Sequence, residues 1–325
     1  MTTGTGGASR YYDPLVWTAE AADDGKPLRD VLQRRLGVSR RLLVKLKSTE
    51  EGITVNGRRA WTNQPVAAGD RIELRIEREV SAEILPQPMD LSIVFEDDHL
   101  LVVNKPAGQI VHPTTGHYMG TLANGIVFYW RERGETCRFH PVHRLDEHTS
   151  GLVVVAKHAY AHQQLAEQMA EGGVEKHYRA YVYGRPPKNR GEVDAPIGRA
   201  SDDPHRRVVR TDGAPSLTYY SVAAAYPCGA SALDIRLGTG RTHQIRVHML
   251  HVGCPLIGDD YYTDESRTPP DLAARLKNVI ARQALHARQL VFRHPVTGAA
   301  MELTAELPRD LRDLEGVLQA WQQEL

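Results

Sequence analysis

Between residues 90 and 308 the sequence alternates short strand-like runs with helical segments, which limits the chain to folds that combine a sheet with helices. Residues 152–155 form an apolar run that is too short for a helix and rich in valine, which favours a buried strand. The stretch AYAHQQLAEQMAEGG carries Leu165 and Met169 four residues apart and ends in two glycines, as an amphipathic helix does. We therefore predict an α+β fold for this part of the chain.

Other runs in the same part predict further strands. The stretch LSIVFEDDHLLVVNKP indicates two strands joined by a turn at residues 96–99. The runs HYRAYVYG, SLTYYSV, LDIRLGTG and THQIRVHML are also interpreted as strands. A short helix is expected over residues 309–325.

The first 89 residues have a different organisation. Residues 1–11 are rich in glycine, threonine and serine and are expected to be a disordered tail. Residues 12–78 predict a compact unit, and residues 79–89, which contain Pro86 and Pro88, predict a linker. The sequence therefore predicts a small N-terminal α+β domain ahead of the larger one.

Two helices and a short β-meander are expected in the compact unit. Apolar residues recur at helical spacing up to Gly37, a plausible C-cap, and Ser39 can cap a second helix. The turns are predicted at Asn56-Gly57 and Gly69-Asp70.

Charge is balanced over the chain but not along it. There are 40 basic and 40 acidic residues, which by itself argues weakly against a nucleic-acid partner. The second predicted helix, however, belongs to a stretch with six cations and no acidic residue. Those cations are Arg34, Arg35, Arg40, Arg41, Lys45 and Lys47.

Several classes of protein are disfavoured by composition. No apolar run approaches the roughly 18 residues that span a bilayer. The three cysteines are widely spaced, which indicates neither a disulfide framework nor a zinc cluster. A cytoplasmic protein is the simplest interpretation.

The most informative stretch for chemistry is HPVHRLDEHTSGLVVVAK, in which Asp146 directly precedes a Thr-Ser-Gly turn and the predicted buried strand. A carboxylate on a loop at the mouth of a sheet is typical of reactive sites. An isolated loop aspartate more often only caps a turn, so the neighbouring residues decide its interpretation.

HRLDEHTSG resembles the H-R-L-D-x-x-T-S-G pattern of the RluA-type pseudouridine synthases. Four further blocks follow the family's order around it: NKPAGQIVHP, EKHYRAYVYG, TGRTHQIRVHMLHVGCPLIGDDYY and LHARQLVFRHPVTG. The resemblance implies the pseudouridine synthase fold, a mixed and mainly antiparallel central sheet flanked by helices. In the N-terminal unit, VSRRLLVKLKSTEEGITVNG is similar to a ribosomal-protein-type (alpha-L) RNA-binding domain, although LKSTEEGIT departs from its usual spacing.

The resemblance also implies roles for individual residues. Asp146 is the expected catalytic carboxylate, Arg246 its ion-pair partner and Tyr178 the active-site tyrosine, while Arg241 is the fallback partner. The residues expected to contact RNA are Arg144, His143, Lys105, His112, Lys176, Arg241, Arg40, Arg41, Lys45 and Lys47.

The implied reaction breaks the bond from ribose C1′ to uracil N1 and joins C1′ to C5, so no atom is gained or lost and no cofactor is required. Asp146 could attack C1′, attack uracil C6 or abstract the C2′ proton, and the sequence does not separate these. The expected partner is RNA, with large-subunit ribosomal RNA as first choice and transfer RNA second, and the family usually works as monomers. A non-catalytic RNA-binding or ribosome-assembly protein is the alternative from another class.

Two other kinds of site are disfavoured. His243, His248 and His251 with Asp259 resemble a metal cluster, but positions 243 and 248 would face opposite sides of the predicted strand. Asp146, His148 and Ser150 are too close on one loop to form a serine hydrolase triad, and G-x-S-x-G is absent.

Overall fold

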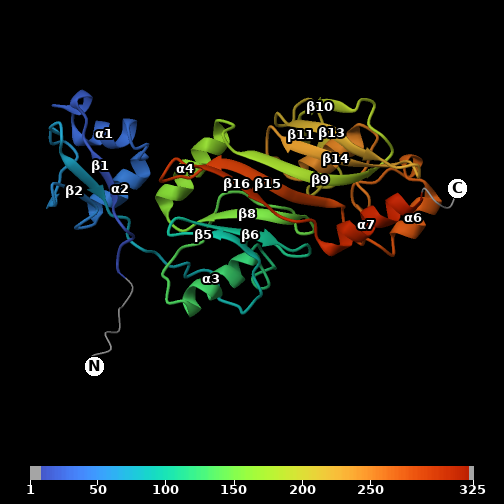
Figure 1. The fold of residues 1–325 in the computed structure, drawn as a ribbon, viewed down its shortest axis with the longest axis horizontal. Coiled ribbons are helices and arrows are strands. Elements are labelled where there is room, and N and C mark those ends of the chain that lie inside the picture. Colours follow the sequence, from blue (N-terminus) through green and yellow to red (C-terminus); the bar gives the residue numbers. More distant parts are fainter. Residues whose placement is uncertain (1–8, 322–325) are drawn as a thin grey trace.

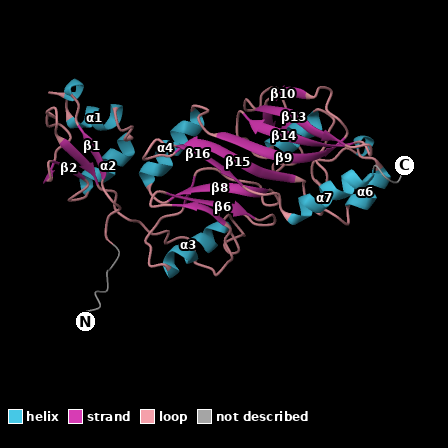
Figure 2. Cartoon of the chain, viewed as in Figure 1, coloured by secondary structure: helices cyan, strands magenta, loops and turns pink. Residues whose placement is uncertain are grey.

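The computed structural model describes residues 9–321 and contains two main sheets (Figures 1 and 2). The strands are β1 (Leu15–Thr18), β2 (Ile53–Val55), β3 (Arg58–Arg59), β4 (Arg71–Leu74), β5 (Ile93–Glu96), β6 (Leu100–Lys105), β7 (His140–Pro141), β8 (Ser150–Ala156), β9 (Glu175–Tyr183), β10 (Arg190–Asp194), β11 (Ile197–Arg199), β12 (Arg207–Val209), β13 (Leu217–Ala225), β14 (Ala230–Leu237), β15 (Leu285–Arg293) and β16 (Ala300–Thr304). The α-helices are α1 (Leu28–Arg34), α2 (Arg40–Ser48), α3 (Leu122–Glu132), α4 (Ala159–Ala170), α5 (Gln244–His251), α6 (Pro270–Leu276) and α7 (Arg309–Ala320). None of the helices described is long and apolar enough to cross a membrane.

The large sheet is mixed and mainly antiparallel, as predicted. Its path is β10-β13-β14-β9-β15-β8-β6-β5, with β16 paired to β15 and β7 to β8. The parallel pair is β8 with β15, where Gly151 faces Ala287. Gly151 has φ +117°, and a Cβ there would lie 2.2 Å from the Ala287 carbonyl oxygen, so only glycine fits where this pair begins.

Helices cover both faces of this sheet. Alternate residues of β8 point to opposite sides: Val153 and Val155 share a core with α3 and α5, whereas Leu152 and Val154 pack with α4. Further along the second face, α6 and α7 pack on β9 and β14. The face that carries α3 and α5 is the one that holds Tyr178, and therefore the one that bears the site described below.

The small sheet has the order β1-β4-β2-β3 and, with α1 and α2, forms the lobe at the left of Figure 1. Ser39 caps α2 as expected, since its hydroxyl accepts a hydrogen bond from the Leu42 amide. Asn56 and Gly57 both have positive φ, the geometry of the predicted hairpin turn.

This lobe is held against the rest of the molecule. Tyr160 of α4 donates a hydrogen bond to the Leu36 carbonyl at 3.0 Å, and the Ser39 amide donates to Gln163 at 3.0 Å. Buried side chains from both sides of residues 79–89 also join one continuous core. The division of the chain into domains at 12–78 and 90–308 therefore stays a prediction.

The two ends of the chain are only partly described. Residues 1–8 of the predicted disordered tail and residues 322–325 of the predicted C-terminal helix lie outside the described residues. Tyr11, which was also assigned to the tail, instead forms a β-bridge with Glu77.

One secondary-structure prediction is wrong. THQIRVHML does not form a strand, because residues 244–251 are helix α5. Ile245, Val247 and Met249 alternate in the sequence, but α5 is covered on two sides. Ile245 and Met249 face the main core, while Val247 packs with Ile197 and Tyr262 under the β11–β12 hairpin. A helix buried on both sides mimics the period of a strand.

Candidate active site

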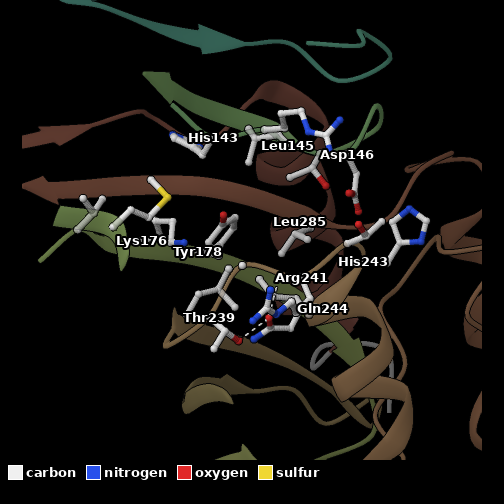
Figure 3. Close-up of a pocket in the computed structure, with 18 of the residues that line it drawn as sticks. His143, Leu145, Asp146, Lys176, Tyr178, Thr239, Arg241, His243, Gln244 and Leu285 are labelled. Atoms are coloured by element: carbon white, nitrogen blue, oxygen red, sulfur yellow. Dashed lines mark hydrogen bonds between the residues drawn. The ribbon is translucent and has the colours of Figure 1, made fainter. Parts of the chain in front are cut away.

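A pocket of about 800 Å³ opens beside the loop that joins β7 to β8 (Figure 3). Its walls come from that loop, from β9, from the ends of β13 and β14, and from the loop that leads into α5. The pocket brings together most of the predicted site residues, which are Asp146, Tyr178, Arg246, Arg144, His143, His112, Lys176 and Arg241.

Asp146 and Arg246 face each other in this pocket. Arg246 Nη1 lies 3.5 Å from Asp146 Oδ2, and the two side chains are 10% and 24% exposed. The carboxylate is thus mostly sheltered from water but open to a ligand. The distance is long for a charge-assisted hydrogen bond, so the two groups form a loose ion pair through one nitrogen and one oxygen.

The bidentate partner of Arg246 is Asp259. Nε and Nη2 of Arg246 donate to the two Asp259 oxygens at 2.7 and 2.9 Å. Asp259 also accepts from the backbone amides of Tyr261 and Tyr262, and the Tyr262 ring lies under the guanidinium at 4.8 Å. Asp259 therefore holds the Nε and Nη2 side of the Arg246 guanidinium, and Nη1 is left to point at Asp146.

Tyr178 lies on β9 and is 6% exposed. Burial, followed by the nearby charge of Asp146, raises the pKa of its phenol. The hydroxyl is consequently protonated at neutral pH and able to donate a hydrogen bond into the pocket.

Lys105 was predicted to contact RNA, but its side chain is buried and its amine is bound within the protein. Its side chain is 0% exposed, and its amine donates to the carbonyl oxygens of Pro106, Gln109 and Glu147 at 2.7–2.9 Å. Burial lowers the pKa of this amine to about 7. Because Glu147 follows Asp146, Lys105 instead supports the loop that carries the carboxylate.

A second buried cation, which sequence reasoning missed, supports the same loop. Arg282 donates from Nη1 to the His148 carbonyl at 3.1 Å and from Nη2 to the Ser150 hydroxyl at 3.3 Å. It also forms a bidentate pair with Asp310 at the start of α7, at 2.7 and 3.0 Å. The only sequence signal for Arg282 was its place three residues before the LHARQLVFRHPVTG block.

His243 also approaches the carboxylate from the start of α5. It has φ +57°, which is unusual for a residue other than glycine, and its Nδ1 lies 2.8 Å from the Tyr262 hydroxyl. Tyr262 in turn accepts from the Arg207 amide at 2.9 Å. This network holds the turn that directs Arg246 into the pocket.

The remaining pocket residues that are predicted to contact RNA differ in how exposed and how charged their side chains are. Arg144 and Arg241 are exposed at its rim, and His112 lines it. His143 is not a cation there: burial lowers its pKa to about 4, and its Nε2 accepts a hydrogen bond from the Val154 amide. The contact of His143 with RNA therefore stays a prediction, and any such contact would be made by a neutral ring.

The N-terminal cations lie outside the pocket, on α2. Arg40, Arg41 and Lys47 are exposed, and among the described residues none of them has an ion-pair partner. Lys45 is instead paired with Glu79, which also binds Arg138. Lys45 thus contributes to the contact between the N-terminal lobe and the rest of the chain.

His248 lies on helix α5, so the strand geometry predicted for these histidines is wrong. Both of its ring nitrogens are engaged within the protein, with Thr218 Oγ1 and with the Ala195 carbonyl, each at 2.9 Å. His248 is therefore part of the packing between α5 and the sheet.

Comparison with known proteins identifies the class to which this fold and pocket belong. Residues 99–251 match the family described as RNA pseudouridylate synthase. The chain is 36% identical over 292 residues to the uncharacterized RNA pseudouridine synthase YhcT of Bacillus subtilis (strain 168), covering 90% of this chain and 93% of that protein. The chain belongs to the RNA pseudouridine synthase family, and the prediction from the five motif blocks is confirmed.

Two further similarities narrow the comparison. The ribosomal large subunit pseudouridine synthase D of Pseudomonas aeruginosa is 40% identical over 261 residues, which cover 79% of this chain and 81% of that protein. Among solved structures, human RNA pseudouridylate synthase domain containing 4 is similar with a TM-score of 0.57 and 26% identity, over 70% of this chain and 92% of that one.

Proposed function

We propose that this enzyme converts a uridine of large-subunit ribosomal RNA to pseudouridine, with Asp146 as the catalytic residue. The observation that carries the proposal is the sheltered carboxylate of Asp146, 3.5 Å from a guanidinium that Asp259 fixes in place. The name of the Pseudomonas relative supports large-subunit RNA as the substrate. A cytoplasmic monomer is part of the same proposal.

The pocket supports a division of labour among its side chains. An enzyme that rearranges a base must take it out of its stack. In this scheme Tyr178 contacts the extruded uracil, Arg246 pairs with the Asp146 carboxylate, and Arg144 and Arg241 bind the RNA at the rim. His112 contributes to the pocket wall beside them.

Maps of pseudouridine in total RNA test the proposed substrate. Cells that carry the gene and cells from which it is deleted are compared at single-nucleotide resolution, with a deletion strain complemented by the Asp146→Asn variant as the matched control. We expect one or a few large-subunit positions to be lost on deletion and restored only by the wild-type gene. Loss confined to transfer RNA would overturn the ribosomal proposal while leaving the activity intact.

The exposed cations of α2 should determine how salt affects RNA binding. Because each phosphate contact releases counterions, the variant Arg40→Gln/Arg41→Gln/Lys47→Gln should flatten the slope of log K against log salt by roughly 2–3 units. Filter binding or fluorescence anisotropy with ribosomal RNA fragments at several salt concentrations measures this slope.

A control variant removes three other exposed cations, Arg185→Gln/Lys188→Gln/Arg190→Gln, from the turn between β9 and β10 and the first residue of β10, away from the N-terminal lobe (Figure 1). It should leave the slope near the wild-type value. Equal slopes for the α2 variant and the wild type would remove that helix from the RNA-binding surface.

A further inference from the structure

Lys176 is a buried cation to which the mechanism above gives no task. Its side chain is 7% exposed and lines the pocket from β9. Among residues 9–321 no side chain or carbonyl forms a hydrogen bond or ion pair with its amine, whereas Lys105, which is 0% exposed, has three carbonyl acceptors. Burial lowers the pKa of Lys176 with no contribution from a carboxylate. The amine opens into the pocket, and an anion bound there would supply the counter-charge that this partly desolvated ammonium lacks within the described protein.

The space in front of this amine is kept open by Gly240. A Cβ at position 240 would lie 3.2 Å from Lys176 Nζ, although the backbone there is not in the left-handed region that requires glycine. A side chain at position 240 would therefore crowd the amine and make it shift by a few tenths of an ångström. The next residue, Arg241, is exposed on the same loop and also lines the pocket.

The spacing of Lys176 from Tyr178 suits a nucleotide. Residues two apart on a strand point to the same side and are separated by about 6.6 Å, and Figure 3 shows both side chains entering the pocket from β9. A base against Tyr178 would therefore have its own or the adjoining phosphate within reach of Lys176.

We propose that Lys176, Gly240 and Arg241 form a phosphate subsite that holds a phosphate of the target nucleotide while its base occupies the pocket. In RNA the ligand is a phosphodiester monoanion, on either the 5′ or the 3′ side of the uridine. The ammonium and the phosphate then neutralise each other, and this gain opposes the energy of unstacking the base. The inference rests on the proposed function, since it assumes that a uridine enters this pocket.

Mononucleotides test the subsite without any need for the natural RNA. Uridine, uridine 5′-monophosphate and uridine 3′-monophosphate are titrated into the full-length protein by calorimetry. The wild type should bind at least one monophosphate about tenfold or more tightly than uridine, and the preferred isomer identifies the side of the phosphate. Lys176→Met should lose this preference, whereas Lys188→Met, at an exposed turn residue, should keep it.

Two further variants separate ligand binding from folding. Gly240→Ala places a methyl group before the amine and should weaken monophosphate binding but not uridine binding. Lys176→Met removes an unpartnered buried charge, so its Tm without ligand should be no lower than that of the wild type. A clearly lower Tm would mean that the amine has a partner in the protein and would overturn the subsite.

The subsite and the proposed function can fail separately. The subsite is overturned if the wild type shows no preference for either monophosphate, or if Lys176→Met retains it, even in an enzyme that forms pseudouridine. A protein that prefers uridine monophosphate but forms no pseudouridine would instead contradict the proposed function alone.

Discussion

Replacing Asp146 with asparagine should reduce pseudouridine formation by at least about 10⁴-fold, because the amide can neither act as a nucleophile nor accept a proton. Asparagine has nearly the same shape as aspartate, so the loop that Lys105 and Arg282 support should keep its geometry. The release of tritium from RNA labelled at uracil C5, measured in single-turnover reactions, reports the rate directly, since C5 loses its hydrogen when it joins C1′.

The affinity of Asp146→Asn for RNA shows whether the variant has lost only its catalytic group or has also lost the ability to bind RNA. The side chain of Asp146 is 24% exposed, and removing a negative charge that faces RNA should leave affinity equal to or slightly above that of the wild type. Its free energy of unfolding should change little. Pseudouridine formed at the wild-type rate by Asp146→Asn would transfer catalysis to another residue and remove the basis of the proposed mechanism.

Replacing Arg246 with methionine should have the second largest effect, on stability as well as on rate. The substitution leaves Asp259 buried without its bidentate partner, which should cost roughly 3–5 kcal/mol of unfolding free energy. It also deprives Asp146 of its cation, and we expect a loss of about 10²–10³-fold in the single-turnover rate. Urea denaturation and tritium release measure the two effects on the same protein.

The double variant Arg246→Met/Asp259→Leu separates these two losses. It removes both buried charges, and buried ion pairs replaced by apolar side chains often recover stability. We therefore expect most of the unfolding free energy to return while the enzyme remains as slow as Arg246→Met. Recovery of the rate along with the stability would show that Arg246 only supports the fold and has no electrostatic role at Asp146.

Much of the large domain could be predicted from local pattern. Residues 150–156 form a buried strand because valines that pack on both sheet faces make a continuous apolar run. Helix α4 was predicted from one apolar stripe and two terminal glycines, and it ends at Ala170. Helix α5 was missed because it packs on the sheet with one side and under the β11–β12 hairpin with the other. Its polar residues Gln244, Arg246 and His248 are also buried, so they do not form the exposed polar side that marks a surface helix.

The parts of the site that could not be predicted depend on contacts between distant segments. Motifs placed Asp146 and Arg246 in one pocket, but they did not show that Arg246 is fixed by Asp259. Lys105 was expected to contact RNA because it belongs to the NKPAGQIVHP block. Only the fold reveals that three carbonyl oxygens surround its amine. Charge alone, read along a chain, does not distinguish a cation that meets RNA from one that holds a loop.

The contacts that anchor the 146–150 loop affect when the pocket can fold during synthesis of the chain. Arg282, 134 residues later in the chain, donates a hydrogen bond to the carbonyl of His148, and Ala287 of β15 pairs with Gly151. Contacts of such long range form late, and a polypeptide leaves the ribosome N-terminus first. A nascent chain therefore displays its carboxylate and its α2 cations well before the anchors exist. The pocket acquires its working geometry only after residues 282–287 have been translated.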